Sequence, residues 1–78
     1  MSEKPYHELE KVGACLVRDG LQREAEGLLK AHEGIFNGTE LYMTWRWKLS
    51  EILKHPSISL QTREEAIRVH AIIDKALH

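Results

Sequence analysis

The apolar residues of the chain recur at steps of three and four along most of its length. This spacing is typical of one face of an α-helix, which turns about 100° per residue. Four such segments predict helices over residues 5–18, 21–36, 40–54 and 62–77. No run alternates apolar and polar residues, so no strand is predicted. The expected fold class is therefore all-α, a small four-helix bundle-like single domain over residues 1–78.

Short polar residues and glycines mark the predicted helix ends. Gly20 can adopt the left-handed conformation that closes the first helix, and Asp19 begins a capping-box spacing that opens the second. Thr39 is expected to cap the third helix, and Thr62 with Glu65 has capping-box spacing for the fourth. Because the connections are short, we expect the first three helices to be antiparallel neighbours. The last helix would then dock across the groove that they leave.

Three glycines interrupt the predicted helices. Gly13 lies on the apolar stripe of the first helix, where it costs about 1 kcal/mol of helix propensity. This position predicts a close approach by a neighbouring helix. Gly27 and Gly34 lie opposite the apolar stripe of the second helix, where they are either neutral or allow another chain to approach closely.

The third predicted helix is apolar on two sides. Its main face carries Leu41, Tyr42, Trp45, Leu49, Ile52 and Leu53. Met43 and Trp47 lie one turn apart on nearly the opposite side. One interpretation is that Ile58 and Leu60, in the segment after this helix, fold back as a lid over both residues. The other is that Met43 and Trp47 form an exposed patch for a partner.

The segment from Tyr42 to Lys48 gathers residue types that are enriched at the centres of protein interfaces, namely Trp, Tyr, Met and Arg. The function we expect is that of a small non-enzymatic protein-interaction or structural domain. Through the third helix it would contact a protein partner or a second copy of the chain, and a homodimer is plausible for so small a domain. The candidate interface comprises Tyr42, Met43, Arg46, Trp47, Ile58 and Leu60.

Two other functions stay open at this point. One is a small-molecule pocket between the third and fourth helices, lined by Trp45, Trp47 and His70. The other is a weak helix-turn-helix DNA binder. The 78 residues carry 11 Lys and Arg against 12 Asp and Glu, and this charge is spread evenly. Since no segment is strongly basic, we expect no nucleic-acid partner and no binding to an anionic membrane.

The five histidines and the single cysteine invite a search for metal or catalytic sites. Metal-binding motifs such as H-E-x-x-H and C-x-x-C do not occur, so we expect no catalytic residues, no cofactor and no metal. His32 and His70 fall on core-facing stripes, and Cys15 is expected to be an inert, partly exposed thiol. The remaining histidines are expected in solvent: His7, His55 and His78.

The location expected for the chain is the cytoplasm. Residues 1–7 show no apolar run behind a basic cluster, so no secretory signal is expected. No stretch approaches the roughly 18 apolar residues of a membrane span. The runs Phe36–Leu41 and Trp45–Leu49 resemble stretches in short bacterial helical proteins, a resemblance that implies no activity.

Overall fold

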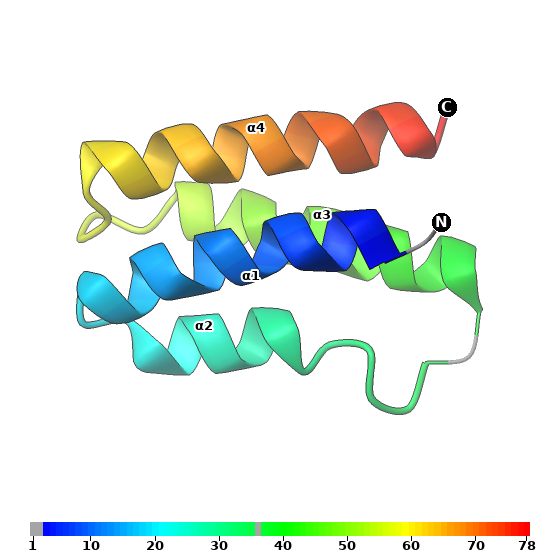
Figure 1. Cartoon of the computed structure of the whole chain (residues 1–78), viewed down its shortest axis with the longest axis horizontal. Helices are drawn as coiled ribbons and strands as arrows, with labels where there is room; N and C mark the ends of the chain where they lie inside the picture. The colour runs from blue at the N-terminus through cyan, green and yellow to red at the C-terminus, as the bar shows by residue number, and fades with distance from the viewer. Residues whose placement is uncertain (1–2, 36) are drawn as a thin grey trace.

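The structure is a computed structural model that describes residues 3–35 and 37–78. Within these residues it contains helices and no strand, which confirms the all-α fold class (Figure 1). Three helices lie within two residues of their predicted bounds, whereas the second is much shorter than predicted. The helices are α1 (Glu3–Arg18), α2 (Gln22–Leu29), α3 (Gly38–Leu53) and α4 (Leu60–Ala76).

Consecutive helices run in opposite directions, so that α1 begins and α4 ends at the same end of the molecule (Figure 1). The helices form a ring in which α1 packs against α2 and α4, and α3 packs against α4 and α2. The predicted antiparallel order of the first three helices is confirmed. The last helix closes the ring between α1 and α3, so that α1 and α3 lie on a diagonal.

One hydrophobic core joins all four helices. Burying a large aliphatic side chain contributes roughly 1.5–3 kcal/mol, so these residues are the main source of stability in a chain without disulfides. The buried cluster consists of Leu9, Val12, Leu16, Ala25, Leu28, Trp45, Leu49, Ile52, Ala66, Val69 and Ile73.

Gly13 is the point of closest approach between α1 and α2, as the sequence predicts. A Cβ atom at this position would lie 2.9 Å from Cδ1 of Leu29, closer than carbon atoms pack. The missing side chain therefore lets Leu29 lie directly over the backbone of α1. Gly20, whose φ is +82°, closes α1 as expected.

Helix α2 ends at Leu29, so the prediction of a helix through residue 36 is wrong. The His32 Nδ1 atom lies 2.9 Å from the carbonyl oxygen of Leu29, the acceptor that a continuing helix would offer to the N–H of Glu33. The Glu33 N–H instead donates to the carbonyl of Lys30. Gly34 then has a φ of +83°, which a helix does not accommodate. Phe36, the predicted last residue of this helix, lies outside the described residues.

The three predicted caps are wrong in detail. Leu21 precedes α2 without a side-chain cap, and Asn37, in place of Thr39, caps α3 by accepting from the Glu40 N–H. Ser59 caps α4 by accepting from the N–H of Thr62, which itself is buried inside the first turn. The chain thus begins α3 and α4 two residues earlier than predicted, because an Asn and a Ser upstream supply the capping oxygen.

The side chain of Asp19 links the end of α1 to the start of α4 by hydrogen bonds. Its Oδ2 atom accepts a 2.9 Å hydrogen bond from the Ser59 N–H and a 2.6 Å bond from the Thr62 hydroxyl. These two bonds, the backbone one first, hold the pKa of Asp19 below its usual value. Sequence spacing had assigned Asp19 to α2, but its partners lie 40 and 43 residues away.

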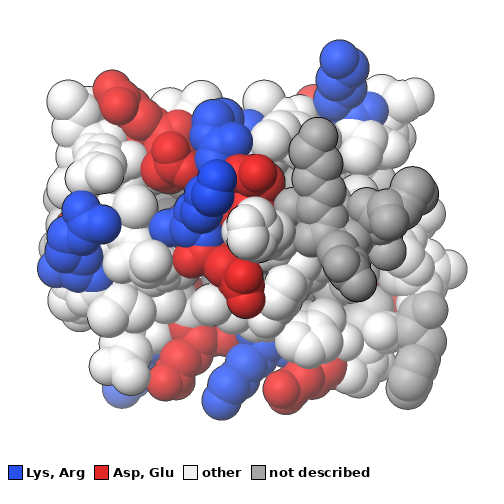
Figure 2. Space-filling view, viewed as in Figure 1, with Lys and Arg blue, Asp and Glu red and all other residues white. Residues whose placement is uncertain are grey.

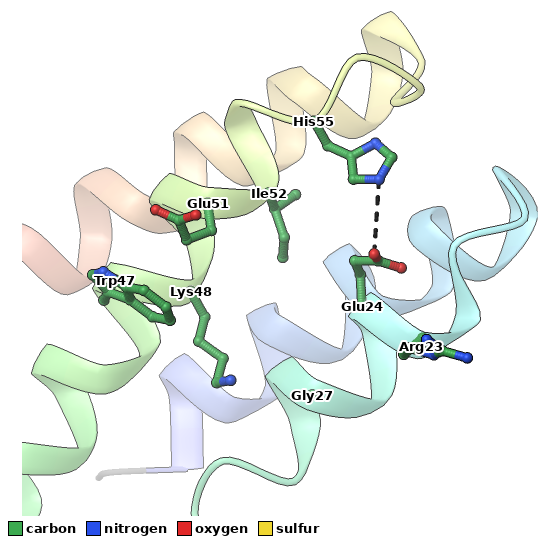
Figure 3. A pocket seen from close by; sticks show the side chains of 8 residues that line it. All are labelled: Arg23, Glu24, Gly27, Trp47, Lys48, Glu51, Ile52 and His55. Carbon is green, nitrogen blue, oxygen red and sulfur yellow. Dashed lines mark ion pairs between the residues drawn. The ribbon is translucent and has the colours of Figure 1, made fainter.

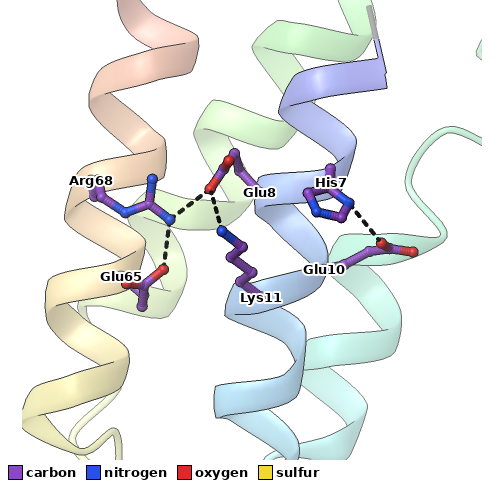
Figure 4. Close-up of polar contacts among 6 residues, drawn as sticks. All are labelled: His7, Glu8, Glu10, Lys11, Glu65 and Arg68. Atoms are coloured by element: carbon purple, nitrogen blue, oxygen red, sulfur yellow. Dashed lines mark hydrogen bonds and ion pairs between the residues drawn. The ribbon is translucent and has the colours of Figure 1, made fainter.

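Charged side chains join α1 and α4 along the line between the two helices, which we call the α1–α4 seam (Figure 4). The Arg68 guanidinium donates to Glu8 at 2.7 Å and to Glu65 at 2.8 Å, and Lys11 lies 3.6 Å from Glu8. The hydrogen bond from Arg68 lowers the pKa of Glu8. On the face that shows α1, acidic and basic side chains are interspersed (Figure 2).

Cys15 is buried, with 7% of its surface exposed, so the prediction of a partly exposed thiol is wrong. It lies seven residues after Glu8 and four before Asp19, and both of these residues bind α4. Helical spacing therefore places Cys15 on the face of α1 that meets α4. A single apolar stripe could not reveal this second buried face.

Candidate interaction surface

Helix α3 turns one tryptophan inward and the other outward. Trp45 is 3% exposed and packs between Tyr6 and Tyr42, with ring centroids 6.2 Å and 5.7 Å away. Trp47 is 60% exposed. Because the two residues are two positions apart, about 200° of helical turn separates their side chains.

The indole N–H of Trp45 is buried and finds no hydrogen-bond partner among the described residues. A buried donor without a partner costs about 1–3 kcal/mol. The apolar contacts of the ring outweigh this cost, since the ring lies in the shared core. Trp45 is therefore a core residue and lines none of the surface grooves described below.

The outward side of α3 carries Met43 and Trp47, which are 50% and 60% exposed. The prediction that Ile58 and Leu60 cover them is wrong. Ile58 packs against the core, and Leu60 is the first residue of α4 and is itself 71% exposed. The alternative prediction, that Met43 and Trp47 are exposed, is confirmed.

From Glu40 onward, the exposed residues of α3 and its C-terminal cap follow one line along the helix, at offsets of three or four residues. We call this line the outer stripe. Its polar members flank the two apolar ones at both ends. The outer stripe consists of Glu40, Met43, Trp47, Glu51 and Lys54.

Three surface grooves meet at Trp47. The first, of about 480 Å³, lies between α2 and α3 (Figure 3). Its wall on α2 includes Gly27, and its wall on α3 includes Lys48, whose ammonium lies 5.8 Å from the centre of the Trp47 ring. At its far end His55 lies 3.7 Å from Glu24. The groove is thus apolar near Trp47 and charged of both signs around it.

The second groove, of about 550 Å³, lies beside the first turns of α3 and is lined by Met43, Thr44 and Trp47 together with Asn37, Thr39 and Glu40. In a helix, residues three and four apart share a face. Met43 and Trp47 therefore form one continuous apolar surface between this groove and the first. A side chain from another molecule could enter on either side of the Trp47 ring.

The third groove, of about 460 Å³, lies between α3 and α4. Its polar side chains bind one another: Arg46 donates to Asp74 at 2.6 Å, and the Ser50 hydroxyl lies 3.2 Å from Nε2 of His70. The bond from Arg46 lowers the pKa of Asp74. Trp47 and His70 line this groove as predicted for a small-molecule pocket, whereas Trp45 does not.

The six candidate interface residues do not form one surface. Met43 and Trp47 line shared grooves, and Arg46 joins them at the α3–α4 groove. Tyr42 is half-buried against the core. Ile58 and Leu60 line none of the three grooves. The outer stripe replaces them with Glu40, Glu51 and Lys54, which sequence reasoning missed because they are ordinary surface charges.

Two histidine predictions are wrong. His32, predicted to face the core, is exposed because α2 ends before reaching it, and its ring packs edge-on against Tyr6. His55 is half-buried beside Glu24 instead of being solvated, whereas His7 and His78 are exposed as predicted. In the described ranges, 3–35 and 37–78, no three His, Cys, Asp or Glu side chains gather in a way that could hold a metal ion.

The three basic residues behind the helix-turn-helix alternative have neighbours in the structure. Arg46 binds Asp74, Lys54 lies 3.5 Å from Glu51, and the Lys48 ammonium lies near the Trp47 ring. None of these contacts favours a nucleic-acid surface, and DNA binding stays an untested prediction. Across the described part of the chain, the helices are too short or too polar to cross a bilayer.

Comparisons of the chain with protein-family models, with curated proteins and with solved structures found no match.

Proposed function

We propose that the protein is a non-enzymatic interaction domain that binds another protein chain, either a partner or a second copy, through the outer stripe of α3. The observation that carries the proposal is the exposure of Trp47 and Met43, 60% and 50%, on one face and one turn apart. Trp is among the residues that most often dominate binding energy at interfaces. Met adapts its shape to different partners.

The surroundings of Trp47 support this role. The three grooves around the ring give a partner side chain room to pack against both the ring and the adjacent helices. Glu40, Glu51 and Lys54 extend the apolar centre into a charged rim. An apolar centre with a polar rim is the usual anatomy of a protein interface.

We also propose a cytoplasmic location. Cys15 is the single cysteine of the chain and is buried against the core, so the domain depends on no disulfide of its own. Proteins of this kind suit a reducing compartment. Two fusions test this proposal, one to a reporter that is active only in the cytoplasm and one to a reporter that is active only after export. We expect a signal from the first fusion alone, and a signal from the second alone would contradict the proposal.

Photo-crosslinking in living cells tests the interaction surface. A photoreactive residue replaces Glu51, which is exposed and lines the α2–α3 groove beside Trp47. A matched probe replaces Ile67 on α4, which is 52% exposed and lies outside the three grooves. We expect covalent adducts from position 51 and none from position 67.

The variant Trp47→Ala, made in the position-51 background, should remove those adducts, while the chain keeps its helical circular-dichroism spectrum. Adducts that persist without the indole would show that the contact does not depend on Trp47. An absence of adducts from position 51 would contradict the proposed function altogether.

A second candidate function is binding of a small molecule in the α3–α4 groove. Its volume of about 460 Å³ falls within the range of ligand sites, roughly 300–1,000 Å³. The Trp47 ring and His70 would contact the ligand. Nuclear magnetic resonance with a fragment library tests this candidate. A fragment that binds in the groove must shift the resonances of residues in both α3 and α4, and His70→Ala must weaken its binding. A library without hits in this groove removes the candidate.

A further inference from the structure

We infer that the occupant of the outer stripe is a second copy of the chain, which places its α3 antiparallel to the first around a two-fold axis beside Trp47. The inference rests on the proposed function, because it names the partner of that same surface. It is carried by the order of the charges along the stripe. The negative end of one stripe faces the positive end of the other only when the two helices are antiparallel.

The outer stripe is centred on Trp47. Glu40 lies seven residues before it and Lys54 seven residues after it. Since seven residues make almost two full turns, both charges point within about 20° of the direction of the indole. Each lies about 10 Å from Trp47 along the helix axis. Opposite charges therefore stand at equal distances on either side of the ring.

Antiparallel pairing places Glu40 of each copy opposite Lys54 of the other, an exposed ammonium that also lies 3.5 Å from Glu51 of its own chain. This gives two symmetry-related ion pairs, and the opposed dipoles of the two helices add to the attraction. Parallel pairing would place Glu40 against Glu40 and Lys54 against Lys54, and like charges in contact are unfavourable. The stripe therefore specifies the direction of its partner helix as well as its identity.

The apolar centre fits the same arrangement. The two-fold axis brings the Trp47 rings together. It places Met43 of each copy opposite Glu51 of the other, about 6 Å along the helix axis from the paired rings. Arg46 and Lys48 point about 100° to either side of Trp47, so they stay clear of the contact line. Each is held in its own copy, Arg46 by Asp74 and Lys48 beside the indole.

The expected dimer is weak and depends on concentration. A stable interface buries about 800 Å² on each partner. Helix α3 has 16 residues and is about 24 Å long, so a single helix pair falls short of that area unless the groove walls on α2 and α4 also contribute. Because weak and transient complexes have the smaller interfaces, we expect a dissociation constant of roughly 1–100 µM.

Sedimentation equilibrium of the full chain, from about 1 µM to about 1 mM, tests the inference. The wild-type chain should pass from monomer to dimer over this range. Trp47→Ala should raise the dissociation constant about tenfold or more. The matched control Ile67→Ala, which truncates an equally exposed apolar residue on α4, should leave it unchanged.

Charge reversal tests the direction of pairing. Glu40→Lys and Lys54→Glu, made singly, should each weaken the dimer about threefold to tenfold, because each places like charges opposite one another. The double variant restores both ion pairs and should return to within about twofold of the wild type. Glu64→Lys and Lys75→Glu, at exposed positions of α4, control for the gain and the loss of positive charge respectively. Circular dichroism confirms that each variant remains helical.

Three results would overturn the inference: a monomer at every concentration, a dimer indifferent to Trp47→Ala, or a double charge variant that stays as weak as the single ones. The crosslinking experiment separates this failure from that of the proposed function. An adduct at position 51 with a mass other than twice that of the chain leaves the interaction surface standing and removes the second copy as its occupant.

Discussion

The two tryptophans of α3 differ in how far the folded chain covers them. The side chain of Trp45 is buried, whereas that of Trp47 is exposed. Trp45 belongs to the core cluster that joins all four helices and keeps only 3% of its surface exposed, even though its N–H finds no partner among the described residues. Trp47 exposes 60% of its surface at the meeting point of three grooves. The inner face of α3 is thus explained by folding, whereas the exposed side chains of its outer face contribute little to folding.

The largest expected effect separates these two faces. Trp45→Ala should lower the free energy of unfolding by about 3–5 kcal/mol, since it removes a large buried ring and leaves a cavity. Trp47→Ala should change it by less than about 0.5 kcal/mol in dilute solution, because an exposed ring contributes little to folding. Urea unfolding of both variants at low concentration checks the comparison. Similar losses for the two variants would mean that the chain itself covers Trp47.

The next largest loss of stability is expected at the start of α4, where the buried Thr62 hydroxyl donates to Asp19. Thr62→Val keeps the shape of a buried side chain but removes the hydroxyl that donates to Asp19. We expect a loss of about 1–3 kcal/mol, because Asp19 keeps its position and loses one of its two donors. Thermal unfolding measures the loss. Glu64→Ala, an exposed change two residues later, is the control, and equal effects from both variants would contradict the role of the Asp19 bonds.

Acidic pH should weaken the hydrogen bonds that carboxylates accept between the helices, and should thereby lower the free energy of unfolding. The pKa values of Asp19, Glu8 and Asp74 are all lowered in the folded chain, by hydrogen bonds from Ser59 and Thr62, from Arg68 and from Arg46 respectively. A carboxyl whose pKa is lower in the folded state favours folding above its unfolded pKa, which is 3.8 for Asp and 4.5 for Glu, and loses this contribution as pH falls through the folded value.

The free energy of unfolding should therefore be nearly constant from about pH 7 to pH 5 and should fall below about pH 4. In Asp19→Ala, which is less stable at neutral pH, the fall should be shallower because one of the shifted groups is absent. Urea unfolding at a series of pH values gives both curves. Parallel curves for the wild type and this variant would contradict the assignment of Asp19.

A small stabilising effect is expected from a substitution in the wall of the α2–α3 groove. A Cβ atom on Gly27 would meet nothing closer than the Lys48 ammonium at 3.9 Å, so Gly27→Ala fits the folded chain without strain. It should stabilise α2 by about 0.5–1 kcal/mol through helix propensity. Thermal unfolding measures this gain. A loss of stability instead would show that the wall of the α2–α3 groove is more tightly packed than the structure has it.

Periodicity predicted what depends on neighbouring residues along the chain. Helical spacing located all four helices and the inner face of α3, and it separated Met43 and Trp47 from that face. The position of Gly13 on an apolar stripe also predicted its contact with another helix. Each of these features follows from a local rule, namely about 100° of turn per residue and the absence of a side chain.

The features that sequence reasoning missed depend on residues far apart in the chain. Asp19 has the spacing of a cap for α2, but its donors lie on α4. Cys15 is buried because α1 meets two neighbours, and only one of them is visible as an apolar stripe. The charged ends of the outer stripe went unnoticed because a charge gains meaning at an interface only once its place on an exposed line is known.

The indole N–H signals of the wild-type chain offer the most direct test of the outer stripe as the contact between two copies of the chain. A soluble paramagnetic agent broadens protons that solvent reaches, and the two tryptophans give two separate signals in a proton spectrum. We expect the Trp47 signal to broaden strongly in dilute solution and to become protected as the chain is concentrated, while the Trp45 signal stays sharp throughout. A Trp47 signal that is already protected at the lowest concentration, or that broadens equally at every concentration, would contradict the account.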